Sequence, residues 1–265
     1  MRTSVVLAAL LLPMTLPAHI IVWQDEFNQP AGTGPDAAKW VHDLGDTGWG
    51  NQELQTYTQS RENSFVVADP DATDGHALVI KAVKSATGYT SARLKTHGKF
   101  ATGPGVRIEA RLRLPKGQGI WPAFWTLGDN IDAVPWPACG EIDIMEMIGH
   151  QPGTLYGTLH GPGYSGKHGL NHSTQLPADQ TFADTYHVFG VEWRKDRIDW
   201  LLDGKVYASV NPASLPAGSK WVFDGAPFYL LLNLAVGGAW PGYPDDTTTF
   251  PQEYRIDYVR VHRLE

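Results

Sequence analysis

Cysteine is nearly absent from this chain of 265 residues, which contains only Cys139. One cysteine cannot form a disulfide within the chain, so an ordinary hydrophobic core must stabilise the fold, as a chain of this length allows. Clusters of basic residues are also lacking. The chain has 21 lysines and arginines and 28 acidic residues, so its net charge is -7. This balance argues against nucleic acid or an anionic membrane surface as a partner.

Long hydrophobic runs are lacking beyond the N-terminal segment. No stretch of the remaining chain approaches the roughly 18 apolar residues of a membrane span. Residues 1–18 have the pattern of a secretory signal peptide. Arg2 supplies a positive start, residues 5–12 are apolar, and Pro13, Pro17 and Ala18 are typical of a cleavage region. No repeat, linker or charge block divides the remainder. We therefore expect a secreted protein, extracellular or periplasmic, whose residues 19–265 form one domain, and we expect a monomer.

Helical periodicity is scarce, and Asn211 to Leu215 is the one short helical turn that the pattern favours. Alternating runs between turn residues are frequent instead. In one of them, Val106 to Leu114, apolar residues alternate with Arg107, Glu109, Arg111 and Arg113, as in a half-buried strand. Similar runs cover 77–83, 141–148, 187–193, 198–202, 228–234 and 254–262. The chain is therefore predicted to be an all-β sandwich or barrel of antiparallel strands.

Three carboxylates are concentrated in one apolar segment, where Glu141, Asp143 and Glu146 alternate with large hydrophobic residues. On a helix the two glutamates would point about 140° apart. On a strand Glu141 and Asp143 share one face, but strict alternation turns Glu146 to the other. An extra residue near Ile144 or Met145 would bring Glu146 back, and bulges of this kind occur beside active sites. We predict that bulge.

The predicted bulge suggests the chemistry of a retaining glycosidase. The Cα atoms of the two glutamates would lie about 13 Å apart, and carboxyls leaning inward on a concave sheet could approach to roughly 5 Å. Glu141 would then be the nucleophile, Glu146 the general acid and base, and Asp143 a partner that holds Glu141 and keeps Glu146 protonated. The alternative is a solvated strand face, but like charges repel there and strands are poor in acidic residues.

The segment GEIDIMEMIG resembles the catalytic signature E-x-D-x-x-E of glycoside hydrolase family 16. Further segments resemble the laminarinase-like endo-β-1,3-glucanases of that family, namely WGNQELQTYT (49–58), SARLKT (91–96), GIWPAFWTLG (119–128), LNLAVGGAWPG (232–242) and IDYVRVH (256–262). The resemblance implies a jelly-roll sandwich of two antiparallel sheets with a substrate cleft on its concave face. It also implies retaining hydrolysis of internal β-1,3 bonds in β-glucans without a catalytic cofactor.

Aromatic residues supply candidate sugar contacts. Trp121 and Trp125 share one strand face, and indole faces stack on the apolar faces of sugars, although both could instead fill a core. The resemblance places them on the donor side of the cleft. Trp240 lies in a glycine-rich loop where exposure is favoured, and the role of Trp136 is left open.

The resemblance also suggests polar contacts. It makes Asn51 and Arg93 donors to sugar hydroxyls, and it places His160 near Glu146, where His160 could hydrogen-bond that carboxyl or a sugar on the leaving side. Taken singly, Asn51 and Arg93 are better explained as turn or surface residues, and His160 is as well explained by a structural role. Cys139 has no part in this chemistry and is expected to be a packed thiol.

A structural calcium ion is a further implication of the resemblance. Asp257 would supply the side-chain ligand, and backbone oxygens near Glu26 and Gly75 would complete a set of hard oxygen donors.

Three alternatives to a β-1,3-glucanase remain at this stage. The enzyme could act on another β-glycan, such as mixed-linkage glucan or galactan, although the E-x-D-x-E pattern typical of lichenases is absent. It could be a transglycosylase that prefers a sugar to water as acceptor. A non-catalytic glucan-binding module is the third, but such a module could lose the carboxylates that this chain keeps.

Overall fold

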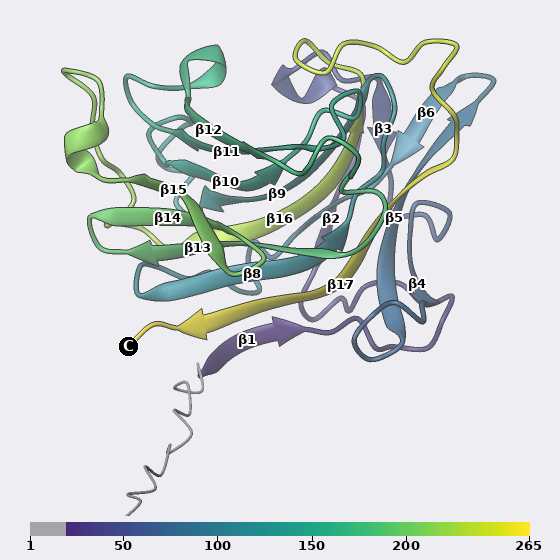
Figure 1. Cartoon of the computed structure of the whole chain (residues 1–265), viewed down its shortest axis with the longest axis horizontal. Coiled ribbons are helices and arrows are strands. Elements are labelled where there is room, and N and C mark those ends of the chain that lie inside the picture. Colours follow the sequence, from purple (N-terminus) through teal and green to yellow (C-terminus); the bar gives the residue numbers. More distant parts are fainter. Residues whose placement is uncertain (1–19) are drawn as a thin grey trace, which may run out of the picture.

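The computed structural model describes residues 20–265, which form two β-sheets packed face to face (Figure 1). The predicted signal peptide lies outside the described residues, and the assignment of one domain to 19–265 stays a prediction. Short 3-10 turns are the helical elements in the described part, η1 (Gly48–Gly50), η2 (Gly166–His168) and η3 (Pro212–Ser214). None of the helices within 20–265 is long and apolar enough to cross a membrane.

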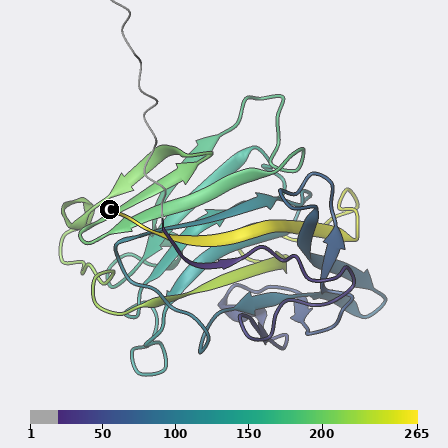
Figure 2. The same cartoon turned by 90° about the horizontal axis from the view of Figure 1, so that it is seen from below.

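The larger sheet has ten strands. Its main path in spatial order is β15 (Lys205–Val210), β14 (Arg197–Leu202), β13 (His187–Arg194), β8 (Val106–Arg113), β17 (Gln252–Arg263), β5 (His76–Ser85), β6 (Gly88–Ser91) and β3 (Gln55–Tyr57). Two more strands pair off this path, β1 (Ile21–Asp25) with β17 and β4 (Ser64–Ala68) with β5. Figure 2 shows β1 beside the long β17.

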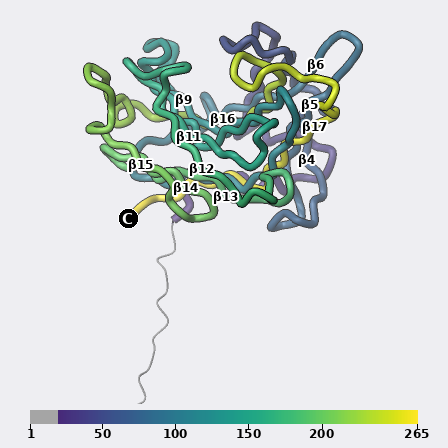
Figure 3. The backbone as a smooth tube through the Cα atoms, turned by 45° about the horizontal axis from the view of Figure 1, so that its top comes forward, coloured from purple at the N-terminus to yellow at the C-terminus, as the bar shows by residue number. Residues whose placement is uncertain are grey.

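The smaller sheet has seven strands, in the order β12 (Leu170–Gln175), β11 (Thr154–His160), β10 (Glu141–Glu146), β9 (Ile120–Gly128), β16 (Phe228–Val236), β7 (Arg93–Lys95) and β2 (Val41–Asp43). Its long strands bend, so the face turned away from the other sheet is concave (Figure 1). Loops lie on either side of β9, β11 and β16 when the top of the molecule is turned forward (Figure 3). We call this concave side the outer face of the smaller sheet.

The structure confirms the predicted all-β fold class. Each alternating run became a strand, and the expected turn after Asn211 is η3, which Asn211 caps through its side chain. One pairing differs from the antiparallel expectation, because β3 runs parallel to β6. The strands β4 and β5 lie between these two in the chain, and a connection of that length lets the backbone return in the same direction.

The core lies between the sheets, and strand alternation supplies it. Ile108, Ala110 and Leu112 of β8 are fully buried, whereas the charged residues between them lie on the opposite face. All nine residues of β16 are buried, as expected for a strand covered on both faces. Apolar burial of this extent is the main stabilising contribution to such a fold.

Candidate active site

The predicted bulge is present in β10. Asp143 pairs with Trp125 of β9, but the next residue of β9, Phe124, pairs with Met145, so Ile144 is the extra residue. Ile144 and Met145 are both buried in the core, and Glu146 regains the outer face that Glu141 and Asp143 occupy. The three carboxylates therefore share one face because two consecutive apolar side chains point inward.

A tryptophan from the other sheet stabilises the bulge. A bulge interrupts the ladder of backbone hydrogen bonds, and a carbonyl left without a partner in the core is costly. Trp200 of β14 reaches across the core and donates its indole N–H to the backbone carbonyl of Asp143 at 2.8 Å. Gly157 of β11 makes room, since a Cβ there would lie 2.4 Å from the Trp200 ring.

Each of the two glutamates accepts a hydrogen bond from an indole. Trp136 Nε1 donates to Glu141 Oε2 at 2.7 Å, and Trp121 Nε1 donates to Glu146 Oε1 at 3.0 Å. Trp121 was predicted as a sugar platform. Its indole N–H also positions Glu146, which is predicted to act as both general acid and general base. The approach of the two carboxyls to roughly 5 Å stays a prediction.

His160 belongs to the same cluster as the three carboxylates and lies beside Glu141 and Asp143. Strand β11 pairs His160 with Glu141, and Tyr156 is the residue opposite Glu146. Its Nε2 atom is 3.1 Å from Asp143 Oδ2 and 3.8 Å from Glu141 Oε1. No hydrogen bond joins His160 to Glu146 within the described residues, although the charge of His160 opposes the rise in the pKa of Glu146. The predicted contact of His160 with Glu146 or with a sugar stays a prediction.

Burial shifts the ionisation of all three carboxyls. It raises the pKa of Glu141 to about 8, with the nearby Asp143 adding to the rise and His160 and Trp136 opposing it. Burial likewise raises the pKa of Asp143 to about 7, and it raises the pKa of Glu146 well above its usual range, with Asp143 again contributing. Three acids in one buried cluster resist ionising together, so the group keeps protons near neutral pH. Such a cluster can offer both a carboxylate and a protonated carboxyl.

One set of side chains within residues 20–265 could also hold a metal ion. Ligand atoms of Glu141, Asp143 and His160 all lie within 4.8 Å of one another. A histidine nitrogen is not a ligand that calcium prefers, so this set is not the predicted calcium site.

The predicted calcium ligands have protein partners instead. The buried carboxylate of Asp257 accepts hydrogen bonds from the backbone and the hydroxyl of Thr73 and pairs with Arg111. Thr73 precedes Gly75 by two residues, so the predicted parts are close, but the Glu26 carboxylate is bound by Arg260. A calcium ion could bind Asp257 only if Arg111 moved away from that carboxylate. The site stays a prediction.

Arg93 anchors an aromatic and polar network on the same outer face. Its Nε atom lies 2.9 Å from Asp43, and its guanidinium lies over the rings of both Trp49 and Trp125, at 4.8 and 4.7 Å from their centroids. Trp125 in turn donates its indole N–H to Asn233 of β16 at 2.7 Å. Arg93 thus fixes two indoles, and its predicted contact with sugar hydroxyls stays a prediction.

The network continues into the loop that holds Asn51. Asn233 donates to the Tyr57 hydroxyl, which donates to Glu53, and the amide of Asn51 donates to the same carboxylate. Burial raises the pKa of Glu53. The backbone N–H of Ala239 bonds to the carbonyl of Asn51 at 2.8 Å, so two loops distant in sequence lie side by side here.

Trp240 is exposed, as predicted, and belongs to an aromatic group beside Glu146. Its ring packs edge-on against Trp121 at 5.4 Å and against Tyr156 at 5.1 Å. Cys139 is 2% exposed and packs with Leu127, Tyr229 and Leu231 on the outer face, as expected for an inert thiol.

Several residues of the site were missed from the sequence. Asn233 is the single polar residue in an otherwise apolar strand, which is a usable signal for a buried polar contact. Trp136 and Tyr156 carry no such signal, because loop position and strand pairing place them.

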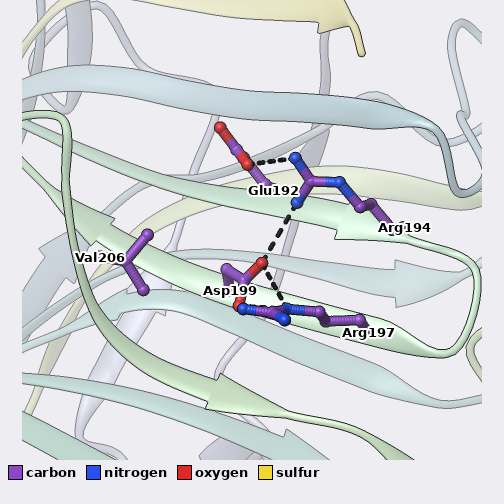
Figure 4. Close-up of a pocket in the computed structure, with 5 residues that line it drawn as sticks. All are labelled: Glu192, Arg194, Arg197, Asp199 and Val206. Atoms are coloured by element: carbon purple, nitrogen blue, oxygen red, sulfur yellow. Dashed lines mark hydrogen bonds and ion pairs between the residues drawn. The ribbon is translucent and has the colours of Figure 1, made fainter. Parts of the chain in front are cut away.

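A hollow on the outer face of the larger sheet is lined by charged residues, but it lacks a cluster of carboxylates like the one in β10 (Figure 4). Asp199, buried at its centre, accepts hydrogen bonds from Arg194, Arg197 and Ser209, and Arg194 also bonds Glu192. These charges neutralise one another, so the hollow is explained by structure.

Comparisons with known proteins identify the family of the chain. The family model described as glycosyl hydrolases family 16 matches residues 52–260. A β-glucanase of Rhodothermus marinus is 41% identical over 260 residues, which cover 93% of this chain and 86% of that protein. The structure of an endo-β-1,3-glucanase from Pyrococcus furiosus superposes with a TM-score of 0.84 at 46% identity, covering 92% of this chain and 94% of that one. The laminarinase catalytic domain of Thermotoga maritima gives the same TM-score and identity, with coverages of 93% and 99%.

Proposed function

The chain belongs to the glycosyl hydrolases of family 16, and from this membership we propose that it cleaves internal β-1,3 bonds of laminarin-like β-glucans with retention of configuration. It is a glycoside hydrolase, and its substrate is a polysaccharide. The observation that carries the proposed mechanism is the bulge in β10, which turns Glu141, Asp143 and Glu146 to one face.

The proposed first step uses one ionised and one protonated glutamate. The Glu141 carboxylate attacks the anomeric carbon while Glu146 gives its proton to the departing glycosidic oxygen, and a glycosyl ester forms on Glu141. In the second step water attacks the same carbon, Glu146 takes the proton from that water, and the bond to Glu141 breaks. Each step inverts the anomeric centre, so the product retains its configuration.

Asp143 supports this division of roles. It lies between the glutamates on the strand, and it raises the pKa of both. When protonated, Asp143 can donate to Glu141, and when ionised it disfavours loss of the proton from Glu146. His160, 3.1 Å from Asp143, is placed to exchange a proton with it.

The donor-side contacts support a glucan substrate. Indole faces suit sugar rings, and the Arg93 network holds Trp125 rigidly beside the carboxylates. Asn51 and Trp240 border the same region. We extend the proposal to catalysis without a cofactor, to secretion and to a monomeric enzyme, which rest on the sequence.

The test is release of reducing ends from laminarin, lichenan, agarose and xyloglucan by the wild-type protein and by Glu141→Gln. We expect laminarin to be the best substrate and Glu141→Gln to lose at least about 10³-fold in kcat, since it removes the nucleophile. Proton NMR of the first product should show the β-anomer. Binding of laminarin without turnover by the wild type would instead establish a binding module, and turnover of agarose alone would remove the substrate assignment.

A further inference from the structure

The side chain of Trp136 is exposed to solvent, yet it donates a hydrogen bond to Glu141, the proposed nucleophile. Its side chain is among the exposed large hydrophobic residues at 44%, yet its N–H is directed to Glu141 Oε2 at 2.7 Å. An exposed indole could bond water at no cost, so the orientation needs another cause. The loop that precedes β10 provides one.

The loop of residues 129–140 that holds Trp136 is anchored at its far end. Cys139 is buried among Leu127, Tyr229 and Leu231, and a Cβ on Gly128 would lie 2.2 Å from the Cys139 carbonyl, so the two backbones are in close contact. Backbone bonds from Ala138 to Pro135 and from Gly140 to Pro137 close consecutive turns. Such an anchor fixes the indole relative to Glu141, because Glu141 is the first residue of β10 and follows Cys139 by two positions.

We propose that Trp136 is a positioning residue that decides which oxygen of Glu141 reacts, by holding Oε2 and leaving Oε1 to attack the anomeric carbon. The inference rests on the function proposed above. Oε1 accepts no hydrogen bond from His160, whose Nε2 lies 3.8 Å away, and Asp143 is the other polar side chain that bonds the Glu141 carboxyl.

The two oxygens then have different fates. In the first step Oε1 forms the bond to the anomeric carbon, the bond from that carbon to the leaving oxygen breaks, and the leaving oxygen takes the Glu146 proton. Oε2 becomes the carbonyl oxygen of the ester and keeps its bond from Trp136. In the second step the electron pair of the carbon–Oε1 bond returns to the carboxylate, whose developing charge the indole N–H stabilises.

Other groups around Glu141 cannot replace this donor. Asp143 and Glu146 approach from β10, His160 from β11, and Cys139 from the preceding loop. Asp143 and Glu146 change their ability to donate when they titrate. The indole N–H donates at every pH and only to the oxygen that it faces.

The experiment compares Trp136→Phe with Trp240→Phe on laminarin. For Trp136→Phe we expect kcat to fall about 10- to 100-fold, the value of a hydrogen bond to a charged group, with KM changed less than about threefold. The acidic limb of kcat/KM should move to higher pH, because the lost donor favoured ionised Glu141. Reactivation of an enzyme trapped with a 2-deoxy-2-fluoro-glycosyl ester should also slow.

Trp240→Phe is the matched control, since that exposed indole packs on Trp121 and Tyr156 without a bond to Glu141. It should raise KM and leave the acidic limb in place. The proposal is overturned if Trp136→Phe raises KM alone and keeps the wild-type kcat and pH profile, which would make Trp136 a sugar platform. Thermal unfolding of each variant verifies folding. The wild type and Glu141→Gln test the proposed function separately, so the two failures can be told apart.

Discussion

Single residues show what side-chain chemistry alone could predict. The grouping of the acidic residues on one face was predictable, because their alternation with apolar residues is written in consecutive positions, and their catalytic roles stay predictions. Trp121 and Trp125 were predicted as platforms from the apolar faces of their rings. Their N–H groups proved equally informative, since Trp121 and Trp136 bond Glu146 and Glu141. Trp121 comes from a neighbouring strand, and the conformation of the preceding loop decides whether Trp136 reaches Glu141, so no local pattern could assign either bond.

The raised pKa of Glu141 predicts a cost in stability. A carboxyl that holds its proton more tightly when folded destabilises the protein as pH rises from the unfolded value of 4.5 to the folded value of about 8. Glu141→Gln removes that cost. We therefore expect the variant to unfold with the wild-type free energy near pH 4.5 and to be more stable by about 1–3 kcal/mol at pH 8.

Thermal or urea unfolding at several pH values measures this difference. Asp143→Asn should behave similarly up to about pH 7, where the pKa of Asp143 lies. A difference between variant and wild type that does not grow with pH would contradict the assignment of a raised pKa to these carboxyls.

Among the elements, long alternating strands were predictable and short ones were not. Strands such as β8 and β17 follow from their alternation, whereas β2, β3 and β7 have three residues each and too few positions to show a period. The bulge was predictable because acidic residues occupy both sides of it. The support from Trp200 was not, since it comes from the opposite sheet.

The bulge predicts opposite results from two similar deletions. Removing Ile144, the extra residue, restores strict alternation and keeps all three carboxylates on the outer face. Removing Ile142, also buried, turns Glu141 toward the core. We expect the Ile144 deletion to retain laminarin hydrolysis within about 10²-fold and the Ile142 deletion to lose at least about 10³-fold.

Circular dichroism and thermal unfolding would establish that each deletion variant folds. Equal activity of two folded variants would show that the register of β10 does not decide the placement of the carboxylates.

Across the whole molecule, many carboxylates pair with basic side chains. Arg111–Asp257 and Arg260–Glu26 are examples on the larger sheet, and Arg93–Asp43 is one on the smaller sheet. Glu141 and Glu146 differ, because indoles bind them. Alternation predicted the sandwich, but the strand order depends on pairings far apart in sequence, such as β1 with β17, and no local signal encodes them.

Asp257 is expected to be important for stability. Asp257→Asn leaves Arg111 without its buried partner, and breaking such a pair costs about 3 kcal/mol. We expect the Tm to fall by about 6–12 °C. If Arg111 is the cation that Asp257 needs, the fall should be equal in chelator and in calcium. A fall confined to calcium-containing buffer would assign Asp257 to a metal ion instead.

The bond from Trp200 to the Asp143 carbonyl makes turnover sensitive to the position of the two sheets relative to each other. A small shift between the sheets would break this hydrogen bond and let the bulge in β10 relax, while both sheets kept their strands. Loss of laminarin cleavage on warming should therefore precede the loss of far-ultraviolet dichroism.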